Sequence, residues 1–330
     1  MNLLTVVRIT FLSIICHAFT LNPVKRSTAV RSLGASTQSN QNNERPTAVL
    51  LCPAQFCVPA DYQQFLTTLQ QKCPKVTTAK VANLPRSEWI KVARQLPTSE
   101  FLQATLNNAK TLQWYFNAIE TSLSEIYAKE GEDVNICIIG HSIGGWVARS
   151  YLGGLSQSST AVYRTTLERC KSFITLGTPH KSPETALVDQ TRGLLTAVEK
   201  TEACSPEYMV QRGMKVTCVG SVGVESKILT TNLEEIVATT SYLPLIQDWK
   251  KIFTGVKGDG IIPEDLVFMD APATRVELLH CSLTGNVVRH AHVLPTPYNL
   301  WAPSEASIPL SEDFRWYGSD GVIDQWITHV

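Results

Sequence analysis

The chain has 330 residues, of which 44% are hydrophobic and 18% charged, and its formal net charge is zero. This composition is typical of a globular protein, and the length fits one domain of about 280 residues with an N-terminal extension. Neutral charge without a basic cluster argues against nucleic acid as a partner. The nine cysteines lack C-x-x-C spacing and indicate no metal site, although Cys204 and Cys218 could pair.

The N-terminal 43 residues have the composition of targeting segments. Residues 1–18 carry an apolar core from Ile9 to Cys16, too short for a transmembrane helix, and end in the small residue Ala18, which predicts a signal peptide. Residues 19–43 contain no Asp or Glu but several basic and hydroxyl side chains, as in transit peptides. Together they predict a bipartite plastid address, with plain secretion as the alternative.

Apolar runs alternate with segments of helical periodicity along the rest of the chain. The predicted elements are a strand at Thr47–Cys52, a helix at Asp61–Gln71, a strand at Lys75–Ala82, a long helix at Leu106–Lys129, and strands at Val134–Ile139, Lys171–His180, Met214–Val222 and Thr274–His280. Strands alternating with helices imply a parallel sheet with right-handed crossovers. We therefore expect an α/β fold with a mostly parallel central sheet and helices on both faces.

One strand leads directly into a glycine-flanked serine. Residues 140–144, GHSIG, fit the pattern G-x-S-x-G, and a helical pattern follows. Small flanking residues let strand and helix approach closely, and the turn between them holds Ser142 in a strained, exposed conformation. We expect Ser142 to be a nucleophile and His141 to be structural. The backbone N–H of Ile143 lies at a helix N-terminus, where it can stabilise an oxyanion.

A serine nucleophile needs a second oxyanion donor and an acid. Folds with this turn supply the second N–H from the loop after the first strand, here Pro53–Phe56, so Gln55 and Phe56 are candidates. The acid follows the serine in chain order, and Asp259 lies between two glycines after a polar stretch. An ordinary Gly-Asp-Gly turn is the alternative interpretation. Lower-ranked acids are Glu264, Asp265 and Asp270.

The base should be one of the histidines that follow the acid. Candidates are His280, His290, His292 and His329. His290 and His292 come after the apolar pair Val287 and Val288, as expected of a last strand that delivers a histidine to the serine. Residues two apart in an extended segment point to the same side, so either could serve, and we favour His290. His280 is the reserve, His329 should be exposed, and no third metal ligand accompanies the pair.

A long connection separates the strand ending near Val222 from Asp259. Such a length usually builds a cap, so a cap insertion is expected at about residues 223–257. From about Ala48 onwards the sequence resembles the plastid-type α/β-hydrolases of plants, algae and cyanobacteria. It is distantly similar to the lipases that deacylate glycosylphosphatidylinositol. The matching pieces are IIGHSIGGWVARSYL, ITLGTPH, DQTRGLL, GDGIIPE and RWYGSDGVIDQW.

This resemblance implies an α/β-hydrolase fold over residues 44–330, with Ser142 as nucleophile and Asp259 as acid. The histidine is not implied, because the segment that carries it is longer here than in the relatives. We expect a serine hydrolase that cleaves a carboxylic ester, with an acyl lipid as substrate, no cofactor and peripheral membrane contact. An acyltransferase using the same acyl-enzyme and a non-catalytic binding module are the alternatives, and the oligomeric state stays open.

The leader generates the first testable prediction. Removing residues 1–43 should leave a soluble protein, because the acid-poor leader has no apolar periodicity with which to join a core. A fluorescent protein fused behind these residues should enter a plastid, as judged by microscopy. Accumulation of the fusion in the medium would contradict the plastid address and favour secretion.

Overall fold

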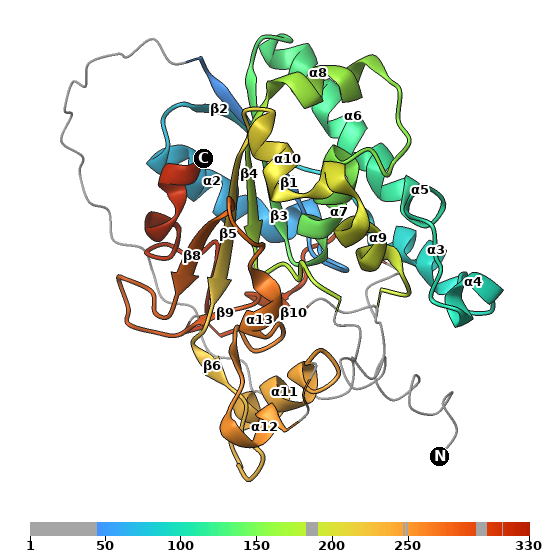
Figure 1. Ribbon diagram of the computed structural model, residues 1–330. Helices are drawn as coiled ribbons and strands as arrows, with labels where there is room; N and C mark the ends of the chain where they lie inside the picture. Colours follow the sequence, from blue (N-terminus) through green and yellow to red (C-terminus); the bar gives the residue numbers. More distant parts are fainter. Residues whose placement is uncertain (1–44, 183–190, 247, 249, 295–301, 312) are drawn as a thin grey trace, which may run out of the picture. The chain divides into compact units, whose positions relative to one another are not determined.

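The computed structural model describes residues 45–182, 191–246, 248, 250–294, 302–311 and 313–330 (Figure 1). The predicted signal peptide and leader therefore lie outside the described residues. Six parallel strands form a central sheet in the order β2-β1-β3-β4-β5-β8. Their bounds are β1 Thr47–Cys52, β2 Val76–Val81, β3 Asn135–His141, β4 Cys170–Leu176, β5 Lys215–Ser221 and β8 Thr274–Leu278.

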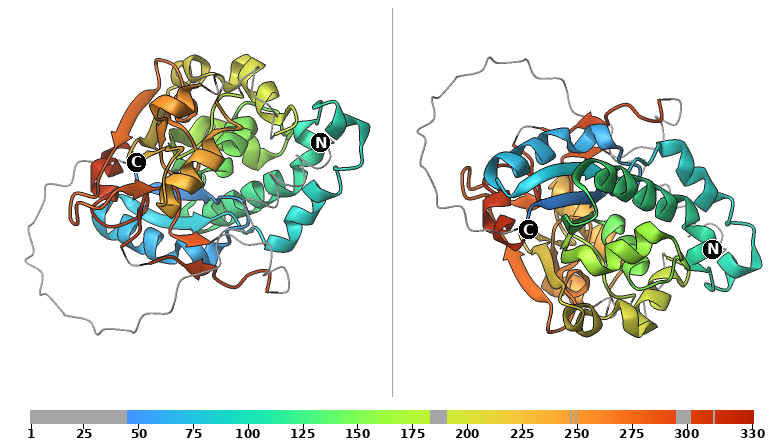
Figure 2. Two further views of the ribbon diagram at one scale, coloured as in Figure 1. Left: turned by 90° about the horizontal axis from the view of Figure 1, so that it is seen from below. Right: turned by 90° about the horizontal axis from the view of Figure 1, so that it is seen from above.

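The central sheet is covered by helices on both faces (Figure 2). Alternate residues of a strand point to opposite faces, and in β1 Leu50 joins one hydrophobic core while Leu51 joins the other. The first core includes α6 (Gln113–Glu130) and α7 (Ile143–Leu152), and the second includes α2 (Gln63–Lys72). This is an α/β-hydrolase-like fold, which confirms the predicted fold class.

Short helices connect the strands. In chain order they are η1 Pro59–Tyr62, η2 Arg86–Trp89, α3 Ile90–Ala93, α4 Ser99–Leu102, α5 Asn108–Thr111, α8 Ala161–Arg169, α9 Leu194–Lys200, η3 Glu202–Cys204, α10 Pro206–Gln211, α13 Glu264–Val267, η5 Ile323–Gln325 and η6 Ile327–His329. None of the helices in the described ranges is long and apolar enough to cross a bilayer.

The prediction of one helix over Leu106–Lys129 is wrong, because the chain breaks between α5 and α6. The indole Nε1 of Trp114 donates a hydrogen bond to the carbonyl of Thr111 at 3.0 Å. In a continuous helix the N–H of Tyr115 would bind that carbonyl, but here it binds the carbonyl of Leu112 at 2.8 Å. A side chain thus occupies the backbone acceptor at the break.

The segment predicted as a cap insertion has a small hydrophobic core of its own. It contains β6 (Val224–Glu225), α11 (Leu233–Tyr242) and α12 (Lys251–Thr254), and β6 pairs antiparallel with β7 (Lys257–Gly258). Its core comprises Val224, Ala238, Tyr242, Ile246, Ile252 and Val256. The β6–β7 pair brings the chain back from the insertion directly to Asp259.

The strand that carries the histidines is not part of the central sheet, contrary to the prediction of a last strand there. The edge strand is β8, and β9 (Val288–Arg289) instead pairs in parallel with β12 (Arg315–Trp316). Trp316 is the partner of Arg289, so the next residues, Tyr317 and His290, leave this pair side by side. A second pair joins β10 (Val293–Leu294) to β11 (Ile308–Pro309).

A buried ion pair attaches the loop after β1 to the segment before β11. Arg86 Nη2 lies 3.7 Å from Asp61 Oδ2, and both side chains are 0% exposed. Arg86 also donates to the carbonyls of Phe56 at 2.9 Å and Glu305 at 2.6 Å. Asp61 accepts from the hydroxyl of Ser307 at 3.0 Å. Two segments far apart in sequence are thereby held by one buried pair.

Breaking this pair should destabilise the fold strongly. We expect Arg86→Met to lower the free energy of unfolding by about 3–5 kcal/mol, because Asp61 would stay buried without its cation. The control is Lys251→Met, which breaks an exposed pair with Asp265 and should change it by less than about 1 kcal/mol. Urea unfolding measures the free energy of unfolding of both variants. Equal losses in the two would contradict the stabilising role of the buried Arg86–Asp61 pair.

Candidate active site

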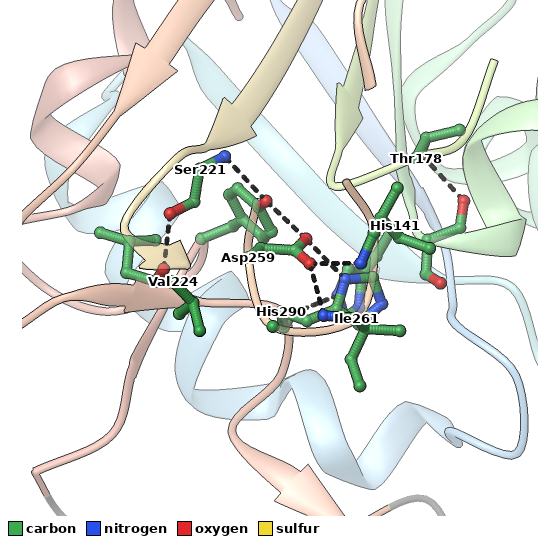
Figure 3. Close-up of polar contacts among 12 residues, drawn as sticks. His141, Thr178, Ser221, Val224, Asp259, Ile261 and His290 are labelled. Carbon is green, nitrogen blue, oxygen red and sulfur yellow. Dashed lines mark hydrogen bonds and ion pairs between the residues drawn. The ribbon is translucent and has the colours of Figure 1, made fainter. Parts of the chain in front are cut away.

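Ser142 occupies the turn between β3 and α7. Its backbone has φ 54° and ψ −127°, a left-handed conformation that is uncommon for a residue with a side chain. Its N–H donates to the carbonyl of Leu176 at 2.9 Å. Its carbonyl accepts at 2.9 Å from the hydroxyl of Thr178, which is labelled in Figure 3. The β4 strand and the loop after it therefore hold this conformation from both sides.

The two outer glycines of the GHSIG turn are required by close approach. A Cβ atom on Gly140 would lie 2.2 Å from Cα of Gly145, so the strand and the helix touch backbone to backbone. A Cβ on Gly144 would lie 2.2 Å from the carbonyl oxygen of Cys52. The start of α7 is thus packed against the end of β1, where the loop with the candidate oxyanion donors begins.

Asp259 lies at the end of β7 and is 1% exposed. Its Oδ1 accepts from the N–H groups of Ile261 at 3.0 Å and Ile262 at 2.8 Å. Its Oδ2 accepts from the hydroxyl of Tyr317 at 2.8 Å and lies 2.7 Å from Nδ1 of His290 (Figure 3). Four hydrogen bonds thus satisfy this buried carboxyl group. Because a carboxylate accepts, the ring proton of His290 lies on Nδ1, which leaves Nε2 able to accept a proton.

The structure brings His290, and not His292, to Asp259. Nε2 of His290 has no hydrogen-bond partner among the described residues. His292 donates from Nε2 to the carbonyl of Asp61 at 2.7 Å, and its ring stacks on Trp316 with centroids 4.2 Å apart. Burial lowers the pKa of His292 below its usual value. Its ring is therefore committed to contacts away from Asp259.

The lower-ranked candidates lie elsewhere on the protein. Each of the three acids pairs with a surface cation: Glu264 with Arg275, Asp265 with Lys251 and Asp270 with Lys181. His280 is exposed beyond β8. His329, predicted to be exposed, is half-buried, and its carbonyl accepts from the hydroxyl of Ser172 at 2.6 Å.

We call residues Pro53–Phe56, which follow β1, the oxyanion loop. Gln55 and Phe56 are half-buried, and Phe56 has a positive φ of 60°. Buried side chains anchor the loop, since Tyr115 donates to the carbonyl of Pro53 at 2.7 Å and Arg86 to that of Phe56. In the described part of the chain, the N–H groups of Gln55, Phe56 and Ile143 donate to no acceptor.

Several groups at this site were not identified from the sequence as functional. Tyr317 binds Asp259 and also accepts from the N–H of Ser221 at 3.0 Å. Tyr317 belongs to RWYGSDGVIDQW and Thr178 belongs to ITLGTPH, two of the sequence pieces that carry the resemblance to the hydrolase family. Those pieces were the sequence signals that could have identified both residues. Tyr62, whose hydroxyl lies 2.9 Å from Nδ1 of His141, has no such signal.

No cluster of three or more His, Cys, Asp or Glu side chains suited to a metal ion occurs among the described residues. The eight described cysteines are all free and buried. Cys204 and Cys218 are among them and therefore do not form a disulfide with each other. Burial raises the pKa of the Cys204 thiol to about 11, so this sulfur behaves as a packed apolar group.

Comparisons with known proteins relate part of this chain to one family. Residues 101–258, slightly less than half of the chain, match the family described as PGAP1-like alpha/beta domain. The match includes Ser142 and ends one residue before Asp259. No curated protein matches the sequence significantly.

Three solved structures illustrate the structural similarity. An acetylxylan esterase is 16% identical with a TM-score of 0.29, and the match covers 41% of this chain and 64% of that one, less than two thirds of its length. The acetyl xylan esterase core domain from Trichoderma reesei is 14% identical, with coverages of 43% and 68% and a TM-score of 0.26. Tomato methylketone synthase I, solved with 2-tridecanone, is 13% identical, with coverages of 86% and 95% and a TM-score of 0.29.

The six-stranded parallel sheet, the turn that holds Ser142 and the family match thus agree with one another. The chain has a hydrolase-like α/β fold, within which residues 101–258 are similar to the PGAP1-like alpha/beta domain.

Proposed function

We propose that this protein is a serine hydrolase that cleaves a carboxylic ester with Ser142, His290 and Asp259. The observation that carries the proposal is the 2.7 Å contact between Nδ1 of His290 and Oδ2 of Asp259. It supports this function because a serine nucleophile needs a base that is itself oriented by a carboxylate. The strained turn at Ser142 supports the nucleophile in the same way.

The proposed reaction has two steps. Ser142 Oγ attacks the ester carbonyl carbon while Nε2 of His290 takes the hydroxyl proton. The N–H groups of Ile143 and of the oxyanion loop bind the oxyanion, and the ester C–O bond then breaks as His290 returns the proton to the leaving alcohol. Water attacks the acyl-enzyme with His290 again as base, which releases the acid and restores Ser142.

An acyl lipid is the proposed substrate. Large apolar side chains are exposed in the insertion, namely Ile228, Leu229, Leu233, Leu243 and Phe253, and Leu229 is 95% exposed. Ile261, two residues from Asp259, is also exposed. Such surfaces favour apolar partners, which supports an acyl chain and peripheral contact with a lipid surface. The acid-free leader supports a plastid as the compartment.

The test of the proposed function uses a fluorophosphonate probe together with ester hydrolysis. Wild-type protein should be labelled, and Ser142→Ala should lose both labelling and about a millionfold in rate, because no other nucleophile replaces the hydroxyl. His290→Ala should abolish turnover, whereas the matched control His292→Ala should retain most of it, since His292 binds Asp61 instead. Labelling that persists in Ser142→Ala would refute the nucleophile.

Tyr317 should matter for turnover through its bond to Asp259. Tyr317→Phe leaves Oδ2 of Asp259 bonded only to His290 and frees the N–H of Ser221. We expect kcat to fall about tenfold to a hundredfold with KM unchanged, because small displacements of the base slow catalysis. The free energy of unfolding should fall by about 1–3 kcal/mol, since a buried N–H stays unpaired.

The control for this variant is Tyr151→Phe. Tyr151 is equally buried, but its hydroxyl has no hydrogen-bond partner among the described residues. Its removal should leave kcat unchanged. Steady-state kinetics and urea unfolding compare the two variants, and an unchanged kcat in Tyr317→Phe would exclude the positioning role.

A further inference from the structure

We propose that His141 is a positioning residue that links the oxyanion loop to the base histidine through Tyr62. This inference rests on the proposed function and extends it to a residue that we expected to be structural. His141 immediately precedes Ser142, is 1% exposed, and has hydrogen-bond partners on both ring nitrogens. One partner is the carbonyl of His290, and the other is the hydroxyl of Tyr62, which in turn binds Ala54 of the oxyanion loop.

The partners of His141 determine its tautomer. Nε2 lies 2.9 Å from the carbonyl oxygen of His290, and because a carbonyl only accepts, Nε2 carries the proton. Burial and the nearby His290 ring hold the pKa of His141 well below its usual value, so the ring is neutral at pH 7. A neutral imidazole has one N–H, and Nδ1 must therefore accept.

The hydrogen bonds form a chain with a single direction. The N–H of Ala54 donates to the hydroxyl oxygen of Tyr62 at 2.9 Å, and that hydroxyl donates to Nδ1 of His141 at 2.9 Å. Nε2–H of His141 then donates to the carbonyl of His290. Both ends are backbone groups with fixed roles, so the chain cannot reverse. Tyr62 is 0% exposed, which keeps competing water away from the middle link.

The two ends of this chain meet the proposed machinery. Ala54 directly precedes Gln55 and Phe56, whose N–H groups are the candidate oxyanion donors. At the other end, the N–H of His290 donates to the carbonyl of Asp259 at 2.9 Å, while its own carbonyl is held by His141. Both peptide groups flanking the base are thus restrained, and its Nδ1 is held by the Asp259 side chain.

This chain of hydrogen bonds therefore fixes the distance between the oxyanion donors and His290. It does so through His141, the residue that precedes Ser142. A displacement of about 1 Å between such groups can slow a reaction by about a hundredfold. A histidine that merely filled the core would influence stability without a selective effect on kcat. The two interpretations thus differ in a measurable quantity.

Three substitutions of His141 separate its two contacts. His141→Gln can place an amide N–H near the position of Nε2 and keep a donor for the His290 carbonyl. His141→Asn can place its oxygen near the position of Nδ1 and keep an acceptor for Tyr62. His141→Leu removes both contacts. We expect kcat to fall about a hundredfold in His141→Leu and about tenfold in the other two, with KM nearly unchanged.

A double-mutant cycle tests whether Tyr62 and His141 act as one chain. Tyr62→Phe and His141→Gln each break the link between the oxyanion loop and the ring, so the double variant should be no slower than the slower single variant. Losses of kcat that add up in the double variant would contradict the inference that Tyr62 and His141 act as one chain of hydrogen bonds. The matched control is Tyr151→Phe, which removes a buried hydroxyl without a described partner and should leave kcat unchanged.

Labelling by the fluorophosphonate probe separates this inference from the proposed function. If wild type is labelled at Ser142 and both Tyr62→Phe and His141→Gln keep wild-type kcat, the inference is wrong and the proposed function stands. If folded wild type is never labelled and hydrolyses no ester, both are wrong. Urea unfolding confirms that each variant is folded, and should His141→Leu fail to fold, the cycle of milder variants still decides.

Discussion

A carboxyl group that is buried needs hydrogen bonds to its oxygens, and the arrangement around Asp259 follows from this requirement. The four donors come from its own loop, from His290 after β9 and from Tyr317 after β12. Tyr317 in turn binds the end of β5 through Ser221. The short β9–β12 pair delivers two of the four donors together, so a minor element of the fold determines the geometry of the site.

The same principle explains the buried charges of Arg86 and Asp61. Arg86 and Asp61 neutralise each other. Arg86 also donates to the carbonyls of Phe56 in the oxyanion loop and of Glu305 before β11, and Asp61 accepts from the hydroxyl of Ser307. Replacing either Arg86 or Asp61 would leave the other as an unpaired buried charge. The intact pair restricts the position of the oxyanion loop. Polar groups in this interior therefore act mainly by fixing the relative positions of loops.

The sequence predicted those parts of the fold and candidate site that depend on local pattern. Alternating apolar runs located the strands of the central sheet, and the GHSIG turn located Ser142 because strand, glycines and helix are contiguous. The contacts of Tyr62 with His141 and of Tyr317 with Asp259 span 79 and 58 residues, and no local periodicity encodes them. The choice between His290 and His292 likewise depends on the pairing of β9 with β12.

The errors in the secondary-structure prediction have the same origin. The helical pattern continues through Leu112, but the Trp114 indole takes the Thr111 carbonyl, and periodicity contains no information on such a competition. The apolar pair before His290 fits a strand in either sheet. Only the tertiary structure decides that it pairs with a segment near the C-terminus, which is a long-range event.

The buried imidazoles also make the folded state sensitive to acid. Burial lowers the pKa values of His141, His180 and His292 below the usual 6.5, so the folded protein resists protonation at positions where the unfolded chain does not. As the pH falls below about 6.5, the unfolded chain therefore takes up more protons, and the folded state loses stability. With respect to these three imidazoles, the folded protein is therefore more stable at neutral or alkaline pH than in acid, where proton uptake shifts the folding equilibrium towards the unfolded chain.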